Sequence, residues 1–195
     1  MIGESPSPAL RTFESETEVR RVSALKTPAG PVGVFPFLDV LEVDLLSARD
    51  RIILLYGVQD PGNVGTVIRS AHAFGAGVAL SAGCADLYNP KTVRATMGSL
   101  FHAPIARELD AIGFLNRARD NGFRTLAAVP EGGEAPASLP EGKSVLAVGA
   151  EGSGLPDIVL EVCDERVTVP SRAASLNAAV AASILLYHAY ARVLG

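Results

Sequence analysis

Hydrophobic residues follow two different rhythms along this chain from residue 51 onward. Short apolar runs of strand character occur at residues 52–57, 78–80, 123–129, 144–149 and 166–169. Hydrophobicity within these runs is continuous rather than alternating, so both faces of each strand must be covered. The runs therefore predict a parallel sheet that lies between two layers of helices.

Between these runs, apolar residues recur with helical spacing. The segment 60-DPGNVGTVIRSAHAFG-75 places four of them at i, i+3, i+4 and i+7, namely Val64, Val67, Ile68 and Ala71. The same spacing predicts helices at residues 64–74, 90–96, 110–121, 156–161 and 175–193. Alternating strands and helices predict an α/β fold, whose ligands bind at the carboxyl ends of the strands.

The N-terminal part of the chain has a different character. Residues 1–15 are rich in Pro and Ser and predict a loose lead-in. A short charged helix is expected at residues 16–26, and an apolar run follows at residues 32–38. We therefore expect an N-terminal extension over residues 1–43 and the main domain over residues 44–195.

Size and composition limit the class of protein. The chain has 195 residues, of which 48% are hydrophobic, and this is ample for a sizeable core. Its longest largely apolar run, residues 178–189, is interrupted by Ser183 and His188. A membrane helix needs roughly 18 to 20 apolar residues, so none is predicted. The N-terminus lacks the pattern of a secretory signal, and the expected location is the cytoplasm.

Charge and cysteine content restrict the kinds of site. The net charge of −4 argues against a protein that holds nucleic acid through overall positive charge, but a local basic patch is compatible with it. Of the 17 basic residues 14 are arginine, a good bidentate ligand for phosphate, although a general bias toward Arg and Ala explains the count equally well. Cys84 and Cys163 lack disulfide or zinc spacing, so we expect inert thiols and no metal site.

Standard catalytic and nucleotide-binding motifs do not fit the glycine-rich segments. The order of glycines in 149-GAEGSG-154 differs from G-x-G-x-x-G, and no acidic residue ends a second strand about twenty residues later. The tripeptide 142-GKS-144 precedes a strand instead of following one. Ser153 is not a nucleophile elbow, because Glu151 occupies the position of its first glycine. None of the histidines has an acid or nucleophile at motif spacing; they are His72, His102 and His188.

Three polar segments remain, and each falls where a parallel sheet would place a site. In the first, Asp60 or Asn63 can cap the helix, and Gly65 permits close approach of another backbone or a ligand. Arg69 is either a solvated charge or a partner for an anion or a hydroxyl group.

The second and third segments add a carboxylate and an amide. Glu151 follows the strand at residues 144–149, and it must face solvent or have a partner because burying an unpaired carboxylate is unfavourable. In the third segment, Ser175 can cap the long Ala-rich helix. That reading leaves Asn177 unexplained, since Ala would be the better helix former at that position.

In this order, the three segments resemble the motifs of the SpoU/TrmH family of RNA ribose 2′-O-methyltransferases in the SPOUT superfamily. The matching residues are Asn63, Gly65, Arg69, Ala71, Gly149, Glu151, Gly152, Gly154, Leu155, Pro170, Ser175, Leu176 and Asn177. The resemblance covers about residues 51–195. It implies a mostly parallel sheet with a deep C-terminal trefoil knot, an S-adenosylmethionine cofactor and an obligate homodimer.

The resemblance also implies roles for individual residues. The cofactor would be held by knotted loops at Ala128, Val129, Gly149, Gly154, Val169 and Leu176. Arg69 would approach the ribose 2′-hydroxyl from the partner subunit and stabilise its oxyanion. The ribose and its flanking phosphate would be oriented by Asn63, Glu151, Ser175 and Asn177.

The chain departs from the family pattern in two places. The segment 170-PSRAASLN-177 is shorter than the usual stretch and lacks its Met and Gly after the proline, so we expect a reshaped cofactor pocket. Residues 16–38 resemble only the closing helix and strand of the small substrate-recognition domain that many relatives carry, which implies a truncated form.

The implied substrate is structured RNA rather than DNA, with rRNA preferred over tRNA. A non-catalytic RNA-binding or assembly module of the same fold is the main alternative. The shortened third segment and the acidic balance favour it, whereas the intact Asn63, Arg69, Glu151 and Asn177 favour activity more. A nicotinamide-dependent enzyme of ordinary doubly wound topology is a further alternative, for which the glycine fingerprint is missing.

Overall fold

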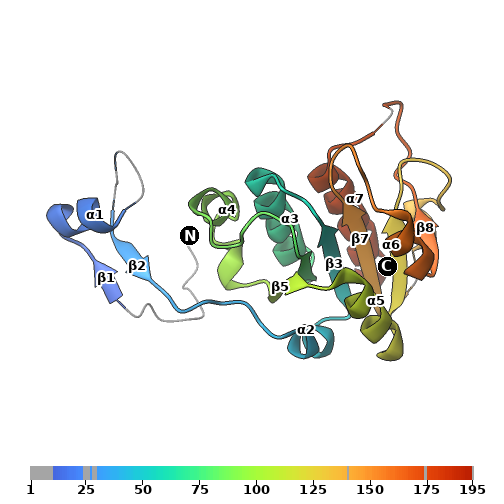
Figure 1. Ribbon diagram of the computed structural model, residues 1–195, viewed down its shortest axis with the longest axis horizontal. Coiled ribbons are helices and arrows are strands. Elements are labelled where there is room, and N and C mark those ends of the chain that lie inside the picture. The colour runs from blue at the N-terminus through green and yellow to red at the C-terminus, as the bar shows by residue number, and fades with distance from the viewer. Residues whose placement is uncertain (1–10, 24–26, 28–29, 140, 174, 195) are drawn as a thin grey trace. The chain divides into compact units, whose positions relative to one another are not determined.

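The computed structural model describes residues 11–23, 27, 30–139, 141–173 and 175–194. The chain divides into two compact units, Met1–Leu38 and Asp39–Gly195 (Figure 1). The described part of the first unit contains the strands β1 (Arg11–Phe13) and β2 (Val32–Val34), which pair antiparallel, and the helix α1 (Glu16–Val22).

Two expectations for the N-terminal unit need correction. Arg11–Phe13 belongs to a strand rather than to a loose lead-in, because its partner Val32–Val34 lies about twenty residues away and local composition does not reveal the pairing. Helix α1 ends at Val22, where the N–H of Ser23 bonds the carbonyl of Val19, whereas a helix to residue 26 was expected. Residues 1–10 and 24–26 lie outside the described residues.

The second unit is built on a six-stranded sheet in the order β5-β4-β3-β7-β6-β8. Every pairing in this sheet is parallel, which confirms the predicted parallel sheet. Its strands are β3 (Arg51–Tyr56), β4 (Gly77–Ser81), β5 (Ile105–Leu109), β6 (Arg124–Ala128), β7 (Ser144–Gly149) and β8 (Glu165–Val167). Strand β5 lacks an apolar run, because it lies at the sheet edge and only Ile105 and Ala106 are buried.

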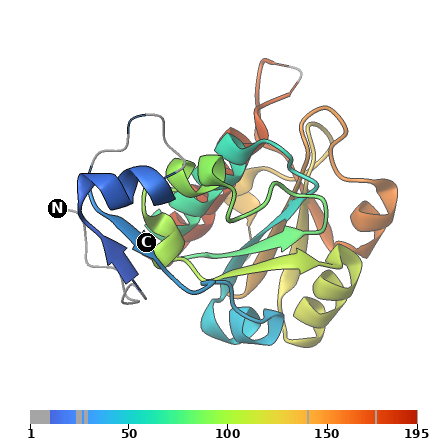
Figure 2. The same ribbon diagram turned by 60° about the vertical axis from the view of Figure 1, so that its left-hand side comes forward.

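Helices cover both faces of the sheet (Figures 1 and 2). On one face, a buried cluster joins Ile52 and Leu54 of β3 to side chains of α2, α5 and α6. Alternate residues of a strand point to opposite faces, so Ile53 and Leu55 pack toward α3 and α7. The helices are α2 (Glu42–Ala48), α3 (Pro61–Ala73), α4 (Pro90–Ala95), α5 (Ala111–Asp120), α6 (Asp157–Val162) and α7 (Ala178–Leu194).

This two-sided packing explains the continuous hydrophobicity of the strands. Two short 3-10 turns, Ser99–Phe101 (η1) and Pro136–Ser138 (η2), complete the described elements. Across the described ranges, no helix combines the length and apolar character that crossing a membrane requires.

The N-termini of α3 and α7 are fixed by side-chain caps. Asp60 Oδ1 accepts a 2.8 Å hydrogen bond from the N–H of Asn63, so Asp60 rather than Asn63 caps α3. At α7, Asn177 Oδ1 accepts from the N–H groups of Ala179 (3.0 Å) and Val180 (3.1 Å). The expected cap at Ser175 is therefore wrong. A cap must directly precede the first helical residue, and Ser175 lies in the loop ahead of it.

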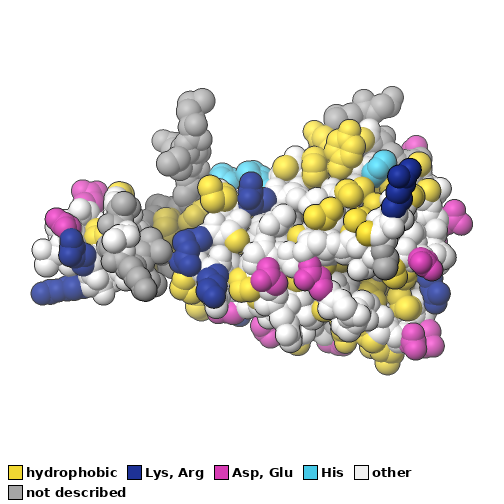
Figure 3. Space-filling model, turned by 90° about the horizontal axis from the view of Figure 1, so that it is seen from above, with side chains coloured by type: hydrophobic (Ala, Val, Ile, Leu, Met, Phe, Trp, Pro, Cys, Tyr) yellow, Lys and Arg dark blue, Asp and Glu magenta, His cyan; other side chains and the backbone are white. Residues whose placement is uncertain are grey.

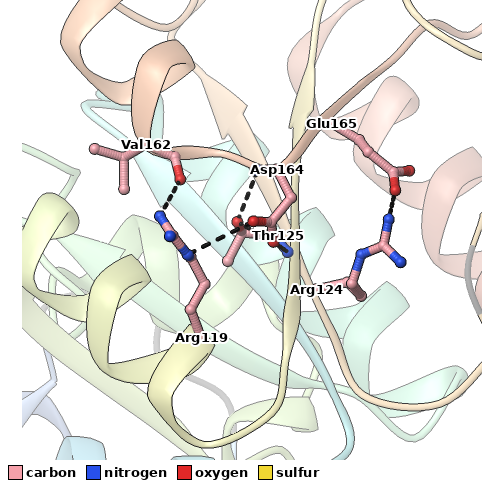
Figure 4. A network of polar contacts seen from close by, with 6 residues as sticks. All are labelled: Arg119, Arg124, Thr125, Val162, Asp164 and Glu165. Atoms are coloured by element: carbon pink, nitrogen blue, oxygen red, sulfur yellow. Dashed lines mark hydrogen bonds and ion pairs between the residues drawn. The ribbon is translucent and has the colours of Figure 1, made fainter.

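A polar clamp ties β8 to β6 (Figure 4). The Asp164 carboxylate accepts hydrogen bonds from the Thr125 N–H (2.8 Å) and the Thr125 hydroxyl (2.9 Å), and it pairs with Arg119 Nε at 3.6 Å. An ion pair between Arg124 and Glu165 adds a second contact between the same strands. The clamp fixes the strand that leads into the loop before α7.

Candidate functional site

A cavity of about 320 Å³ opens where β6, β7 and β8 end. It is lined by residues at the ends of β6, β7 and β8 and of the loops after them, and by Ala178, Ala181 and Leu185 of α7. All the residues predicted to hold a cofactor lie in its wall, namely Ala128, Val129, Gly149, Gly154, Val169 and Leu176. This is the edge of the sheet at which α/β proteins bind ligands.

Backbone hydrogen bonds fix one side of this cavity. The N–H of Val129 donates to the carbonyl of Val167 at 2.9 Å, and the N–H of Thr168 donates to the carbonyl of Glu134 at 2.9 Å. The Thr168 hydroxyl accepts from the N–H of Gly133, also at 2.9 Å. These bonds hold the loops after β6 and β8 side by side and shape one wall of the cavity.

The turn after β7 folds back tightly on its own strand. A Cβ at Gly149 would lie 2.1 Å from the carbonyl carbon of Gly154, so only glycine fits there. The N–H of Gly154 bonds the carbonyl of Ala150 at 2.9 Å, and Gly152 has a left-handed φ of 87°. This tight turn carries Glu151 to the mouth of the cavity.

Glu151 forms a polar cluster with Asn63 and Asn177, which we call the amide–carboxylate cluster. Asn63 Nδ2 donates to Glu151 Oε1 at 2.9 Å, and Asn177 Nδ2 donates to Asn63 Oδ1 at 3.1 Å and also to Glu151 Oε1. Asn177 Oδ1 is committed to capping α7, so its amide nitrogen must face the carboxylate. Within the described part of the chain, Glu151 Oε2 has no hydrogen-bond donor and can accept from a ligand.

A second, more polar cavity of about 330 Å³ adjoins the first. It is lined by Gly57, Val58, Gln59, Asp60, Asn63, Ala150, Glu151 and Ser153. The two cavities share Ala150 and Glu151, so the amide–carboxylate cluster stands between them. The sequence analysis missed Gln59 and Ser153 as site residues, although the position of Gln59 soon after β3, at the carboxyl edge of the sheet, was a usable signal.

The other two predicted catalytic residues do not join the cluster. Ser175 lines the first cavity but does not bond to Asn63, Glu151 or Asn177. Arg69 is exposed on α3 and lies six positions after Asn63, so the two side chains leave the helix on different faces. No described residue accepts a hydrogen bond from its guanidinium.

The cysteines do not supply a nucleophile at this site. Burial raises the pKa of the Cys84 thiol, and burial followed by the charge of Asp164 raises the pKa of Cys163 to about 11. Both thiols therefore stay protonated near neutral pH. Among the described residues, no three His, Cys, Asp or Glu side chains gather as metal ligands would. The site offers amides, a carboxylate and backbone groups, which are hydrogen-bonding groups rather than nucleophiles or metal ligands.

Sequence comparison relates the chain to RNA methyltransferases. The model of the SpoU rRNA Methylase family matches residues 50–187. The 23S rRNA (guanosine(2553)-2′-O)-methyltransferase RlmP of Bacillus subtilis is 37% identical over 170 residues, which cover 85% of this chain and 68% of RlmP. The uncharacterized tRNA/rRNA methyltransferase Rv0881 of Mycobacterium tuberculosis is 38% identical over 151 residues, which cover 73% of this chain but only 52% of that protein.

Solved structures share the fold. An rRNA methyltransferase from Sinorhizobium meliloti superposes with a TM-score of 0.84 at 31% identity, covering 93% of this chain and 71% of that one. The SpoU methyltransferase AviRb from Streptomyces viridochromogenes, solved in complex with the cofactor AdoMet, gives a TM-score of 0.74 at 30% identity and covers 87% of this chain and 68% of that one.

Proposed function

This chain belongs to the SpoU rRNA methylase family, and we propose that it transfers a methyl group from S-adenosylmethionine to a ribose 2′-hydroxyl of structured RNA. One observation carries the proposal: the amide–carboxylate cluster stands between an apolar cavity and a polar one. A polar cluster between two cavities suits a reaction between two ligands, one in each cavity. Because the name of RlmP specifies 23S rRNA, we prefer rRNA as the substrate, and an RNA substrate favours action in the cytoplasm.

The apolar cavity suits the cofactor. Val129, Val169 and Leu176 offer apolar surface to an adenine ring, while the backbone at residues 149–154 offers N–H and carbonyl groups to its polar edges. When bound, S-adenosylmethionine supplies an electrophilic methyl group on its sulfonium. The AdoMet complex of AviRb supports this choice of cofactor.

The polar cavity suits the nucleoside that receives the methyl group. Glu151 Oε2 accepts a hydrogen bond from a ribose hydroxyl, while Asn63 and Asn177 hold the carboxylate in place. An alcohol oxygen attacks well only as its proton leaves, and a fixed guanidinium stabilises the negative charge that develops. Arg69 has this role in our proposal.

Arg69 can serve this site only from a second copy of the chain, so the proposal includes a homodimer. The guanidinium is exposed, and it leaves α3 away from the amide–carboxylate cluster. A hydrophobic surface on α7 supports pairing, because Val180 and Tyr187 are 47% and 54% exposed and the Tyr187 ring lies 5.8 Å from that of Phe74 on α3. Hydrophobic side chains gather over the region of α7 in Figure 3.

The proposal extends to the knot and the N-terminal unit. We assign the deep trefoil knot of this family to the segment from β8 to α7, supported by its backbone bonds to the loop after β6. We assign the N-terminal unit to substrate recognition, supported by the resemblance of residues 16–38 to the closing helix and strand of the small recognition domain.

Calorimetric titration with S-adenosylmethionine, and with NADH in parallel, tests the cofactor. We expect micromolar binding of S-adenosylmethionine and no response to NADH. Absence of binding to either would favour the non-catalytic RNA-binding module, and binding of NADH alone would favour the nicotinamide enzyme.

Arg69→Ala tests the catalytic assignment through methyl transfer from labelled S-adenosylmethionine to a 23S rRNA transcript. We expect the rate constant to fall by about 10²- to 10³-fold, as when an oxyanion donor is removed. Cofactor affinity should not change, because Arg69 does not line the first cavity. The control is Arg166→Ala, which removes an exposed charge on β8. Activity within a few-fold of wild type, at unchanged dimer content, would rule out Arg69 as the hydroxyl partner.

A further inference from the structure

One face of α3 packs against α4 and against the turn that follows α4. A Cβ at Gly65 would lie 2.4 Å from Ala95 Cβ, so the backbones of α3 and α4 touch there. Two turns later, His72 Nδ1 lies 3.2 Å from the Ser99 hydroxyl. Arg69 and His72 follow Gly65 by four and seven positions, so all three share one face of α3. Arg69 therefore lies between the two contacts. The exposed guanidinium of Arg69 therefore borders α4 and the turn that follows it.

The solvent-facing side of α4 carries two positively charged side chains. Lys91 and Arg94 are exposed and three residues apart, while the intervening Thr92 is fully buried. The helical hydrogen bonds continue past Ala95, because the N–H of Met97 bonds the carbonyl of Arg94 at 3.1 Å. Met97 is exposed and directly follows this last turn of α4. We call Lys91, Arg94 and Met97 the α4 surface.

Met97 combines two unfavourable features. Its side chain is 76% exposed, and its φ of 49° lies in the left-handed region, which side chains other than Asn and Asp seldom adopt. Gly98, with a φ of 87°, completes the turn. Residues held in sparsely populated backbone conformations are concentrated at active sites and ligand clamps. The turn holds a flexible, polarisable thioether in solvent beside two cations.

The charges of the α4 surface have no ion-pair partners among the residues that the structure describes. No described acidic residue pairs with Lys91, Arg94 or Arg69, although the chain has a net charge of −4. The neighbouring Asp86 instead accepts a 3.0 Å hydrogen bond from the Tyr88 N–H. In Figure 3, basic side chains (dark blue) and histidines (cyan) lie together over the region of α3 and α4.

His72 carries less positive charge near neutral pH than an ordinary histidine, because its pKa is lowered. The rings of His72 and His102 stack with their centroids 4.6 Å apart. Partial burial and then the charge of His102 lower the pKa of His72. The permanent positive charges here are those of Arg69, Lys91 and Arg94.

We propose that the α4 surface binds the single-stranded RNA next to the target nucleotide. Lys91 and Arg94 contact successive phosphates, and Met97 packs against the face of an unstacked base. Two cations one helical turn apart complement a phosphate backbone better than they complement a neutral partner. This inference rests on the proposed function, because the RNA strand that brings a ribose to Arg69 must pass the surface beside it.

The test measures binding of two probes by fluorescence anisotropy across a range of NaCl concentrations: a uridine 20-mer and a 23S rRNA transcript. For Lys91→Ala/Arg94→Ala, we expect the slope of log K against log salt to fall by about 1.4, since each single-strand phosphate contact contributes about 0.7. Affinity at 0.1 M salt should fall roughly tenfold. Met97→Ala should weaken binding without changing the slope, because it removes no charge. Met97→Gly should behave like Met97→Ala while also relieving the backbone strain.

Lys143→Ala/Arg166→Ala is the matched control. It removes the same two charges from exposed positions before β7 and on β8. A salt slope for Lys91→Ala/Arg94→Ala equal to that of this control would overturn the proposal. So would a shift of the variant to monomers in sedimentation, which would assign the α4 surface to the subunit interface. Methyl transfer by the wild type is measured separately, so an inactive wild type would refute the proposed function without deciding where RNA binds.

Discussion

A hydrogen atom is all that fits on the α4 side of Gly65. An added methyl would lie 2.4 Å from Ala95 Cβ and 2.8 Å from the Ala95 carbonyl carbon, which belongs to the backbone and cannot rotate away. We therefore expect Gly65→Ala to destabilise the fold by about 1–3 kcal/mol, as overpacking does, although alanine is the better helix former.

Urea unfolding measures this effect. Thr66→Ala is the control, because Thr66 is the exposed neighbour of Gly65 on the same helix, and its unfolding midpoint should change little. A midpoint for Gly65→Ala at or above that of the wild type would mean that α4 can move away without loss.

At the scale of elements, the N-terminus of α7 has two tasks that can be separated. Asn177 Oδ1 caps the helix, while Asn177 Nδ2 donates to Glu151 and Asn63. Asn177→Ala should lose both tasks and about 1 kcal/mol of stability. Asn177→Ser should keep the cap, and hence the stability, but methyl transfer should fall because the short hydroxyl cannot also hold Glu151.

Parallel unfolding and activity assays distinguish these outcomes. If Asn177→Ser keeps full activity, the amide donor is dispensable and the cluster acts only as a structural cap. If it is as unstable as Asn177→Ala, the capping contribution lies elsewhere.

The clamp between β6 and β8 is a second feature at this scale. Asp164→Ala leaves the buried N–H and hydroxyl of Thr125 without their acceptor, which should destabilise the fold by about 1–3 kcal/mol. The pair Asp164→Ala/Thr125→Val should be less destabilising than the sum of its two single variants, because both remove the same hydroxyl hydrogen bond. Glu165→Gln, which disrupts the partly exposed pair with Arg124, should lose at most about 1 kcal/mol.

Equilibrium unfolding of the four variants provides the comparison. Strict additivity of Asp164→Ala and Thr125→Val would show that the two residues stabilise the fold independently and that the clamp is not a unit.

At the scale of the whole molecule, the proposed two-subunit site can be tested by mixing inactive variants. In a mixed dimer of Arg69→Ala and Glu151→Gln chains, one site receives an intact Glu151 from one subunit and an intact Arg69 from the other. Random mixing in equal amounts makes half of the dimers mixed, so about a quarter of wild-type activity should return.

The mixture is unfolded and refolded together before the assay so that the subunits exchange. Each variant treated alone is the control and should stay inactive. If the mixture recovers no activity although sedimentation shows dimers, Arg69 and Glu151 do not meet across the subunit interface in the way we propose.

Much of the architecture follows from local sequence alone. The apolar runs at β3 and β7 predicted central strands because a strand covered on both faces must be apolar throughout. The spacing around Val64 and Ile68 predicted α3, because a helix with one buried face repeats its apolar residues every three or four positions. Both patterns lie within short stretches of sequence, and they are clear because the residues that form them are buried in the core. The edge strand β5 and the short helix α2 were missed, because partial burial leaves a weaker pattern.

The meeting of Asn63, Glu151 and Asn177 was decided by tertiary structure. Asn63 and Asn177 are 114 positions apart in the chain, and residues this distant have no local signal of contact. They meet because β3 pairs directly with β7, which brings the turn carrying Glu151 beside the start of α3. Sequence by itself determined which residue types were available, whereas strand order decided which of them touch, since hydrogen bonding between strands sets distances that spacing along the chain does not encode.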